Sequence, residues 1–132
     1  MPKIAFVCVE NAGRSQMAAA FARRAHRAGL TILSGGTNPA PRVNPTVVEA
    51  MREVGIDLSR EVPRAVGPAE LADCDYVVTM GCAAGDVCPA TFRGDAADWD
   101  LPDPKGKSLE DVRRIRDEIE RRVRAFLDEV GP

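Results

Sequence analysis

An α/β fold built on a small parallel sheet is predicted by the way apolar runs and helical patterns alternate along this chain. The two clearest runs, 3–7 and 76–80, are short and almost wholly apolar, which is typical of strands covered on both faces. Stretches with helical periodicity separate and follow these runs. Such alternation favours parallel strands joined by right-handed crossovers. The sequence has no internal repeat or linker, so we predict a single domain over residues 1–132.

The first of these strands, 3–7, ends in Cys8 and is followed by a helical pattern. The apolar stripe of that pattern comprises Met17, Phe21, Ala25 and Ala28. Gly29 is expected to stop the helix, because glycine readily takes the left-handed conformation that ends helices. We predict a second strand over 30–33, ended by 34–36.

A second helix is predicted from Asn44, a good cap, and Pro45, which suits the first helical position. Its expected buried stripe is Val48, Met51 and Val54, and Gly55 is the expected stop. A short helix is predicted over 68–72, before the strand at 76–80. A fourth, short strand is expected at 99–101.

The last helix carries the strongest pattern in the chain. Ser108 and Asp111 resemble a capping box at its start. Its apolar residues fall at intervals of three and four, which places them on one face: Val112, Ile115, Ile119, Val123, Phe126 and Val130. Acid-before-base pairs one turn apart are expected on the wet face: Asp117–Arg121, Glu118–Arg122 and Glu120–Arg124.

Composition restricts the classes of function. The net charge of −2 offers no basic field for nucleic acid or anionic membrane. No run approaches the roughly 18 apolar residues of a membrane span, and the N-terminus does not resemble a secretion signal, so we expect a cytoplasmic protein. The chain has four cysteines, Cys8, Cys74, Cys82 and Cys88. In a reducing compartment these suggest catalysis, metal binding or core packing rather than static disulfides.

The segment from Cys8 to Ser15 is the strongest candidate for a functional site. Cys8 stands where a buried strand ends, and Arg14 stands where a helix begins. This arrangement directs backbone N–H groups and the positive end of the helix dipole into one concavity, which favours a tetrahedral oxyanion and a thiolate. Arg14 can donate two hydrogen bonds to the anion, and Ser15 can donate one to the thiolate. The predicted oxyanion-binding residues are Cys8, Val9, Glu10, Asn11, Ala12, Gly13, Arg14 and Ser15.

The alternative interpretation of this segment is a small buried cysteine with a surface arginine nearby. However, the segment resembles the active-site loop of the low-molecular-weight protein tyrosine phosphatase family. The run 14–18 is closest to its arsenate reductase branch, since phosphatases more often have proline where Gln16 stands. The similarity continues through 34–37, 44–45, 77–80 and 103–104, and so covers essentially the whole chain. It implies a three-layer fold with a four-stranded parallel sheet flanked by helices.

Two departures from the family bear on the site. Glu10 places a carboxylate where many members have glycine, so it must point away from the anion. Some arsenate reductases hold potassium near the loop asparagine, using acidic side chains. Ala19 and Arg64 stand roughly where those acids are expected, and we therefore predict no potassium site and no tightly bound cofactor.

The resemblance implies that Asp103 is the general acid. It lies between two prolines, each with a restricted φ, and a positioned Asp can protonate a leaving oxygen. The alternative is a turn-forming Asp, because Pro-Asp-Pro also suits a turn. Asp98 and Asp100 are nearby candidates that we interpret as surface residues.

Cys82 and Cys88 lie in a segment rich in Gly and Ala, which can change conformation easily. The resemblance implies that Cys8 attacks arsenate, that Cys82 then attacks Cys8 and releases arsenite, and that Cys88 attacks Cys82. A thioredoxin-type protein would reduce the final disulfide. Inert loop thiols are the alternative, and the spacing and a lone histidine disfavour zinc. Cys74 is interpreted as a small core residue.

Three alternatives remain open at this point. A low-molecular-weight protein tyrosine phosphatase would act through a Cys8 phosphocysteine, although few aromatic residues are available to bind an aryl group. An arsenate reductase coupled to mycothiol or another small thiol would need a different reductant. A non-enzymatic phosphoryl carrier or anion-binding module would not need Arg14 and Asp103. We expect a monomer, with an oxyanion and a thiol reductant as its partners.

Overall fold

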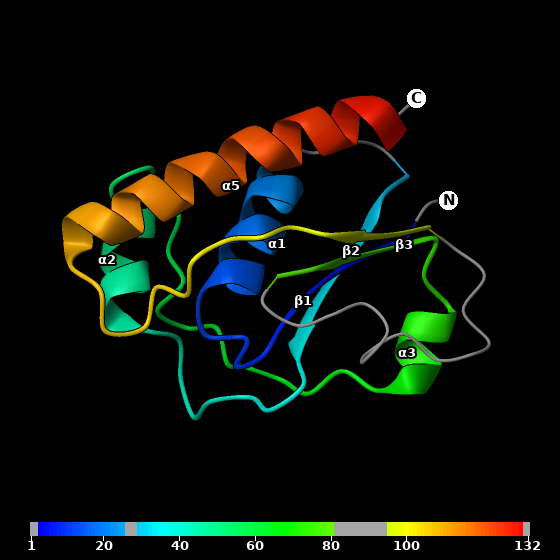
Figure 1. Ribbon diagram of the computed structural model, residues 1–132, viewed down its shortest axis with the longest axis horizontal. Coiled ribbons are helices and arrows are strands. Elements are labelled where there is room, and N and C mark those ends of the chain that lie inside the picture. The colour runs from blue at the N-terminus through cyan, green and yellow to red at the C-terminus, as the bar shows by residue number, and fades with distance from the viewer. Residues whose placement is uncertain (1–2, 26–28, 81–94, 131–132) are drawn as a thin grey trace.

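The sheet at the centre of the structure has four parallel strands in the order β2-β1-β3-β4 (Figure 1). In this computed structural model, the described residues are 3–25, 29–80 and 95–130. The strands are β1 (Lys3–Cys8), β2 (Thr31–Gly36), β3 (Tyr76–Thr79) and β4 (Asp95–Asp98). The helices are α1 (Arg14–Arg24), α2 (Pro45–Arg52), α3 (Pro68–Ala72) and α5 (Leu109–Val130).

Helices lie on both faces of this sheet, so the predicted three-layer α/β fold is confirmed. Figure 1 shows α1, α2 and α5 on one side and α3 on the other. The central strand, β1, is covered on both faces: Ile4 and Phe6 pack into the larger core, under α1, α2 and α5. Ala5 and Val7 pack with the smaller core, which contains Leu71 of α3. This double coverage explains why the strand is apolar throughout rather than alternating.

Strand β2 extends further than predicted, because 34–36 belong to the strand instead of ending it. Gly35 and Gly36 pair with Val7 and Cys8 in the parallel register. A Cβ on Gly36 would lie 2.5 Å from the backbone oxygen of Val9, so only glycine allows the strand to approach the loop after Cys8 this closely. Gly35 and Gly36, which the sequence suggested would end the strand, instead belong to it, and Gly36 lets two backbone segments lie close together.

The fourth strand is β4 at 95–98, and the prediction of a strand at 99–101 was wrong. The sequence Asp-Ala-Ala-Asp lacks the β-branched and aromatic residues that mark strands. Pairing with β3 in the tertiary structure determines this strand, and Thr79 Oγ1 donates to Asp98 Oδ1 at 3.0 Å. Trp99 follows the strand and packs against Phe126 with ring centroids 6.0 Å apart.

The first two helices begin as predicted, but α1 ends earlier. Helix α1 starts at Arg14 and ends at Arg24, so Ala25 is its exposed C-cap rather than part of the buried stripe. Ala28 lies outside the described residues. The α2 cap is confirmed, since the Asn44 side chain accepts a hydrogen bond from the Thr46 N–H at 2.9 Å. The buried stripe was predicted only in part: Met51 is buried, but Val48 and Val54 are partly buried, and Val47 and Ala50 take the core positions.

Helix α5 buries one face along its length, as its pattern predicts. Its buried apolar side chains are Val112, Ile115, Ile119, Val123 and Leu127. Leu127 therefore occupies the core position predicted for Phe126, which is half-buried and contacts Tyr76 edge-on. The Val130 side chain lies outside the described residues. The Ser108 cap is confirmed, because its Oγ accepts from the Asp111 N–H at 3.2 Å.

Ion pairs on α5 largely follow the predicted spacing. Two predicted pairs form, Glu118–Arg122 at 2.7 Å and Glu120–Arg124 at 3.0 Å. The predicted Asp117–Arg121 pair was wrong: Asp117 contacts Arg116 at 2.8 Å, and Arg121 contacts Glu118 at 2.6 Å. Arg121 reaches Glu118 because residues three apart also share a helix face.

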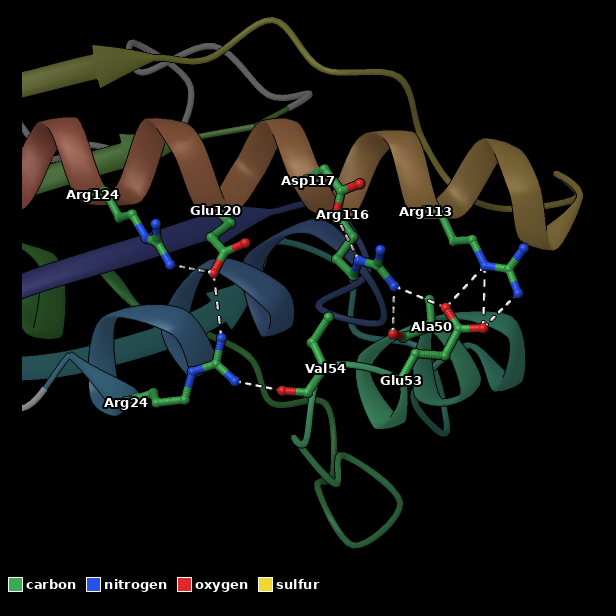
Figure 2. Close-up of polar contacts among 9 residues, drawn as sticks. All are labelled: Arg24, Ala50, Glu53, Val54, Arg113, Arg116, Asp117, Glu120 and Arg124. Atoms are coloured by element: carbon green, nitrogen blue, oxygen red, sulfur yellow. Dashed lines mark hydrogen bonds and ion pairs between the residues drawn. The ribbon is translucent and has the colours of Figure 1, made fainter.

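Polar contacts join α5 to α2 and α1, as Figure 2 shows. Glu53, just after α2, accepts hydrogen bonds from Arg113 and Arg116 of α5. These contacts, that with Arg113 above all, lower the pKa of Glu53 from 4.5 to about 2. Arg116 also donates to the Ala50 backbone oxygen at 2.8 Å.

No helix in the part of the chain that the structure describes is long and apolar enough to cross a bilayer.

Candidate active site

The loop between β1 and α1 lies at the carboxyl edge of the sheet, where the strand order changes direction. From β1 the chain continues to β2 on one side and then returns to β3 on the other. Parallel α/β sheets bind ligands in the crevice at such a point. Cys8 is the last residue of β1 and Arg14 is the first of α1, so the fold places both ends of the predicted loop in this crevice.

The Cys8 sulfur accepts a hydrogen bond from the loop backbone and contacts a hydroxyl. The Asn11 N–H donates to Sγ at 3.2 Å, and Ser15 Oγ lies 2.8 Å from Sγ. The Asn11 side-chain amide donates to the same Oγ at 2.7 Å. With the hydroxyl oxygen already accepting from Asn11, its own hydrogen is free to point at the sulfur. A thiolate can only accept, so this arrangement suits a Cys8 thiolate.

Asn11 holds the loop in shape from a fully buried position. Its φ of +52° lies in the left-handed region, which Asn tolerates better than most residues. Its Oδ1 accepts from Gln16 Nε2 at 3.1 Å and from the Arg64 N–H at 3.0 Å. Sequence reasoning missed this support. Gln16 is the residue that could have predicted it, because its side-chain amide can donate to Asn11, whereas the proline that many phosphatases have at this position cannot.

Arg14 lies beneath the pocket with a nearly buried guanidinium. Its Nη1 donates to the Leu101 backbone oxygen at 3.0 Å, and its Nη2 lies 3.6 Å from Asp103 Oδ2. Its Nε is buried and has no hydrogen-bond partner among the described residues. An unpaired buried donor is unfavourable, so this nitrogen is available to a ligand oxygen.

The segment that carries Asp103 packs directly on the loop between Cys8 and Arg14. A Cβ on Gly13 would lie 2.6 Å from Pro104 Cγ, so the close packing requires glycine at this position. The Lys105 N–H donates to Asp103 Oδ1 at 3.0 Å, which is the turn contact that the alternative interpretation expects. The other carboxylate oxygen faces Arg14, so the turn also presents a carboxylate at the site.

These residues surround a cavity of about 380 Å³. Of the predicted oxyanion-binding residues, the ones that line it are Cys8, Glu10, Ala12, Gly13 and Arg14. Asp103 and Arg42 are also part of its wall, the latter from the segment before α2 that sequence reasoning missed. The described wall contains no aromatic residue. The side chain of Glu10 contacts Lys105, with Oε1 and Nζ 3.2 Å apart.

The structure does not describe every predicted site residue, and the two alternatives to Asp103 do not line the cavity. Cys82 and Cys88 are outside the described residues. Asp98 accepts from Thr79 at the sheet edge, and Asp100 is exposed; neither lines the cavity. Arg64 lies beside the loop: its backbone N–H donates to Asn11 Oδ1 at 3.0 Å, and its Nη1 donates to the Ser34 backbone oxygen at 3.1 Å.

Cys74 is a core residue, as predicted. It is buried with the smaller core on the α3 side, whereas Cys8 belongs to the larger core on the opposite face. Its thiol lies 3.3 Å from the Glu70 backbone oxygen, to which it donates. Burial raises the pKa of the Cys74 thiol, which keeps it protonated and unreactive.

Comparison with known proteins agrees with this geometry. Residues 3–131 match the profile of the low molecular weight phosphotyrosine protein phosphatase family. A protein of Halobacterium salinarum named "Putative arsenate reductase" is 49% identical, over 98% of this chain and 94% of its own length. The glutaredoxin arsenate reductase of a Synechocystis species is 34% identical, over 99% of this chain and its full length.

A solved structure gives the same result for the fold. The thioredoxin-dependent arsenate reductase of Corynebacterium glutamicum superposes with a TM-score of 0.82 and 34% sequence identity. The match covers 98% of this chain and 61% of that one.

Proposed function

Because the chain belongs to the low molecular weight phosphotyrosine protein phosphatase family, we propose that it is an arsenate reductase of that family. One observation carries the proposal, namely that Cys8 and Arg14 line the same cavity. There the Cys8 sulfur accepts a hydrogen bond from the Asn11 N–H and contacts the Ser15 hydroxyl. The buried Nε of Arg14 has no hydrogen-bond partner among the described residues. A tetrahedral oxyanion would supply the missing acceptor. Relatives named as arsenate reductases support arsenate as that oxyanion.

The first step joins the Cys8 sulfur to arsenic. The thiolate attacks arsenate, an S–As bond forms, and one arsenate oxygen departs as water. Asp103 supplies a proton to that oxygen, and its place 3.6 Å from Arg14 supports this role. Arg14 stabilises the charge that accumulates on the remaining oxygens.

The next steps transfer two electrons to arsenic. The Cys82 thiolate attacks the Cys8 sulfur, a disulfide forms, and the S–As electron pair leaves with arsenic as arsenite. The Cys88 thiolate then attacks Cys82, releases the Cys8 thiolate and forms the Cys82–Cys88 disulfide. A dithiol protein reduces this disulfide. The named partners of the relatives, thioredoxin and glutaredoxin, support a reductant of that class. We place the reaction in the cytoplasm, where the thiols stay reduced.

Phosphotyrosine hydrolysis is the second candidate, because the family is named for this activity and the Cys8 loop could also attack a phosphate ester. The described cavity wall has no aromatic residue to stack on an aryl group, and this observation favours a small inorganic substrate. The sequence also contains Cys82 and Cys88, which the proposed reduction of arsenate uses and which hydrolysis does not require.

The proposal can be tested by incubating the protein with arsenate, thioredoxin, thioredoxin reductase and NADPH, and following NADPH oxidation. Parallel assays should replace thioredoxin with a glutaredoxin system and with mycothiol. We expect arsenate-dependent turnover with one of them. No turnover with any reductant, together with rapid hydrolysis of para-nitrophenyl phosphate, would overturn the proposal in favour of a phosphatase.

A further inference from the structure

Glu10 is an unusual residue to find in the wall of an anion-binding cavity. Its side chain is 31% exposed, and the residue lines the same cavity as Cys8 and Arg14. A negative charge at this position opposes the entry of a dianion. Lys105 Nζ lies 3.2 Å from Glu10 Oε1 and therefore pairs with this charge. The two residues are 95 positions apart, so the pair exists only in the folded chain.

The ion pair is not needed to hold the two loops together. Pro104, next to Lys105, packs against Gly13, and Arg14 donates to the Leu101 backbone oxygen on the same segment. Both contacts are buried or close, whereas the Lys105 side chain is 73% exposed. Exposed ion pairs contribute little to stability. The effect of the pair on the site is therefore expected to come from its charge rather than from its stability.

The charges around the cavity are so nearly balanced that Lys105 changes the net charge of the wall appreciably. The ionisable side chains of the described wall, apart from Cys8, are Glu10, Arg14, Arg42, Asp103 and Lys105. Two carboxylates thus offset two of three cations. When Lys105 neutralises the charge of Glu10, Arg14 and Arg42 attract the oxyanion without opposition from that carboxylate. Without Lys105, the negative charge of Glu10 would reduce this attraction.

We propose that Lys105 sets the oxyanion affinity of this site by cancelling the charge of Glu10, an inference that rests on the proposed function. Lys105 is thus a binding residue that acts through Glu10. This role makes the two single variants change affinity in opposite directions. Lys105→Met leaves Glu10 unbalanced and weakens oxyanion binding about fivefold, which is about 1 kcal/mol. Glu10→Gln removes the opposing charge, frees Lys105 to attract the anion and strengthens binding.

The test measures inorganic phosphate binding, so it does not depend on arsenate turnover. Increasing phosphate protects Cys8 from alkylation by iodoacetamide, and mass spectrometry of the Cys8 peptide gives the apparent Kd. We expect Lys105→Met to raise this Kd, Glu10→Gln to lower it, and the double variant to lie near the wild type. Lys105→Arg should restore wild-type affinity, and the differences should shrink in high salt.

Lys107→Met is the matched control, because Lys107 is an exposed lysine on the same segment and does not line the cavity; its Kd should equal that of the wild type. Weaker binding in both single variants would mean that the pair holds the loops together, and it would overturn the proposal. Unchanged binding in both would also overturn it. If the wild type binds phosphate but reduces no arsenate, the proposed function fails while the charge effect is still measured.

Discussion

The Asn11 side-chain amide donates to the Ser15 hydroxyl at 2.7 Å, and this contact determines how the hydroxyl can bond to the Cys8 sulfur. Because the hydroxyl oxygen accepts from Asn11, its hydrogen can point to the Cys8 sulfur 2.8 Å away. The Cys8 sulfur, which we propose to be the nucleophile, is thus supported by a two-step chain of hydrogen bonds within one loop.

We expect Ser15→Ala to lower kcat/KM for arsenate by about 10- to 100-fold, because a hydrogen bond to a charged group contributes about 1.5–3 kcal/mol. The time course of Cys8 alkylation by iodoacetamide at pH 7 should slow in the same variant, since the sulfur loses a hydrogen-bond donor. Ser59→Ala, which changes an exposed serine that does not line the cavity, is the control and should leave kcat/KM unchanged. Equal alkylation rates for Ser15→Ala and the wild type would contradict this role of the hydroxyl.

The packing of Pro104 on Gly13 leads to a second prediction. In Gly13→Ala the added Cβ would lie 2.6 Å from Pro104 Cγ, so the Asp103 segment must move away from the anion loop. We expect at least a tenfold loss of kcat in steady-state assays, because about 1 Å of misplacement is costly in catalysis. Gly67→Ala is a suitable control, since nothing lies within 4 Å of its Cβ. Full activity of Gly13→Ala would show that the position of Asp103 is unimportant.

The cysteines should separate into distinct classes in single-turnover and multiple-turnover assays. Cys82→Ser should abolish multiple turnover and leave weak phosphatase activity, because Cys8, Arg14 and Asp103 suffice for hydrolysis. Cys88→Ser should allow one turnover per enzyme with thioredoxin. Loss of both activities in Cys82→Ser would indicate a structural role for that residue, and full cycling of Cys88→Ser would point to a small-thiol reductant.

Cys74→Ala is the control for the cysteine series. Its thiol is buried on the far face of the sheet, so we expect kcat within about twofold of the wild type and a destabilisation of about 1 kcal/mol. Urea unfolding and the NADPH-coupled assay measure the two quantities. A large loss of turnover without loss of stability would assign Cys74 a redox role.

The contact of Glu53 with Arg113 and Arg116 predicts a pH dependence of stability (Figure 2). The pKa of Glu53 is lowered to about 2 in the folded protein, first through its hydrogen bond to Arg113. A lowered folded-state pKa stabilises the protein above the unfolded-state value and loses that effect as pH falls. The contribution should therefore disappear between pH 4.5 and about 2.

Urea unfolding of the wild type and of Glu53→Gln at pH 7, 4 and 2.5 tests this. The difference in the free energy of unfolding between the two should be largest at pH 7 and smallest at pH 2.5. Glu118 has a similarly lowered pKa, so both proteins should lose some further stability over the same range. Glu61→Gln, whose partner Arg23 lies 3.9 Å away, is the matched control. A pH-independent difference would mean that Glu53 acts through packing.

Local pattern predicted much of this architecture, because the residues that mark each element lie close together in the chain. The apolar run of β1, the Asn44 cap of α2 and the spacing of α5 all depend on local chemistry. The same holds for the Cys8–Arg14 loop, which a strand end and a helix start define. Where local signals were weak or ambiguous, the predictions failed. Strand β4 has no strand-forming side chains, and Gly35–Gly36 looked like a stop.

By itself, then, the sequence determined that a cysteine and an arginine bracket the first strand-to-helix loop of an α/β domain. Only the tertiary structure decided what surrounds that loop. It placed Pro104 on Gly13, Asp103 beside Arg14, and Lys105 against Glu10. The physical reason is that these contacts join segments some 90 residues apart, whose relative position depends on how the helices pack on the sheet. No local periodicity or turn preference carries that information.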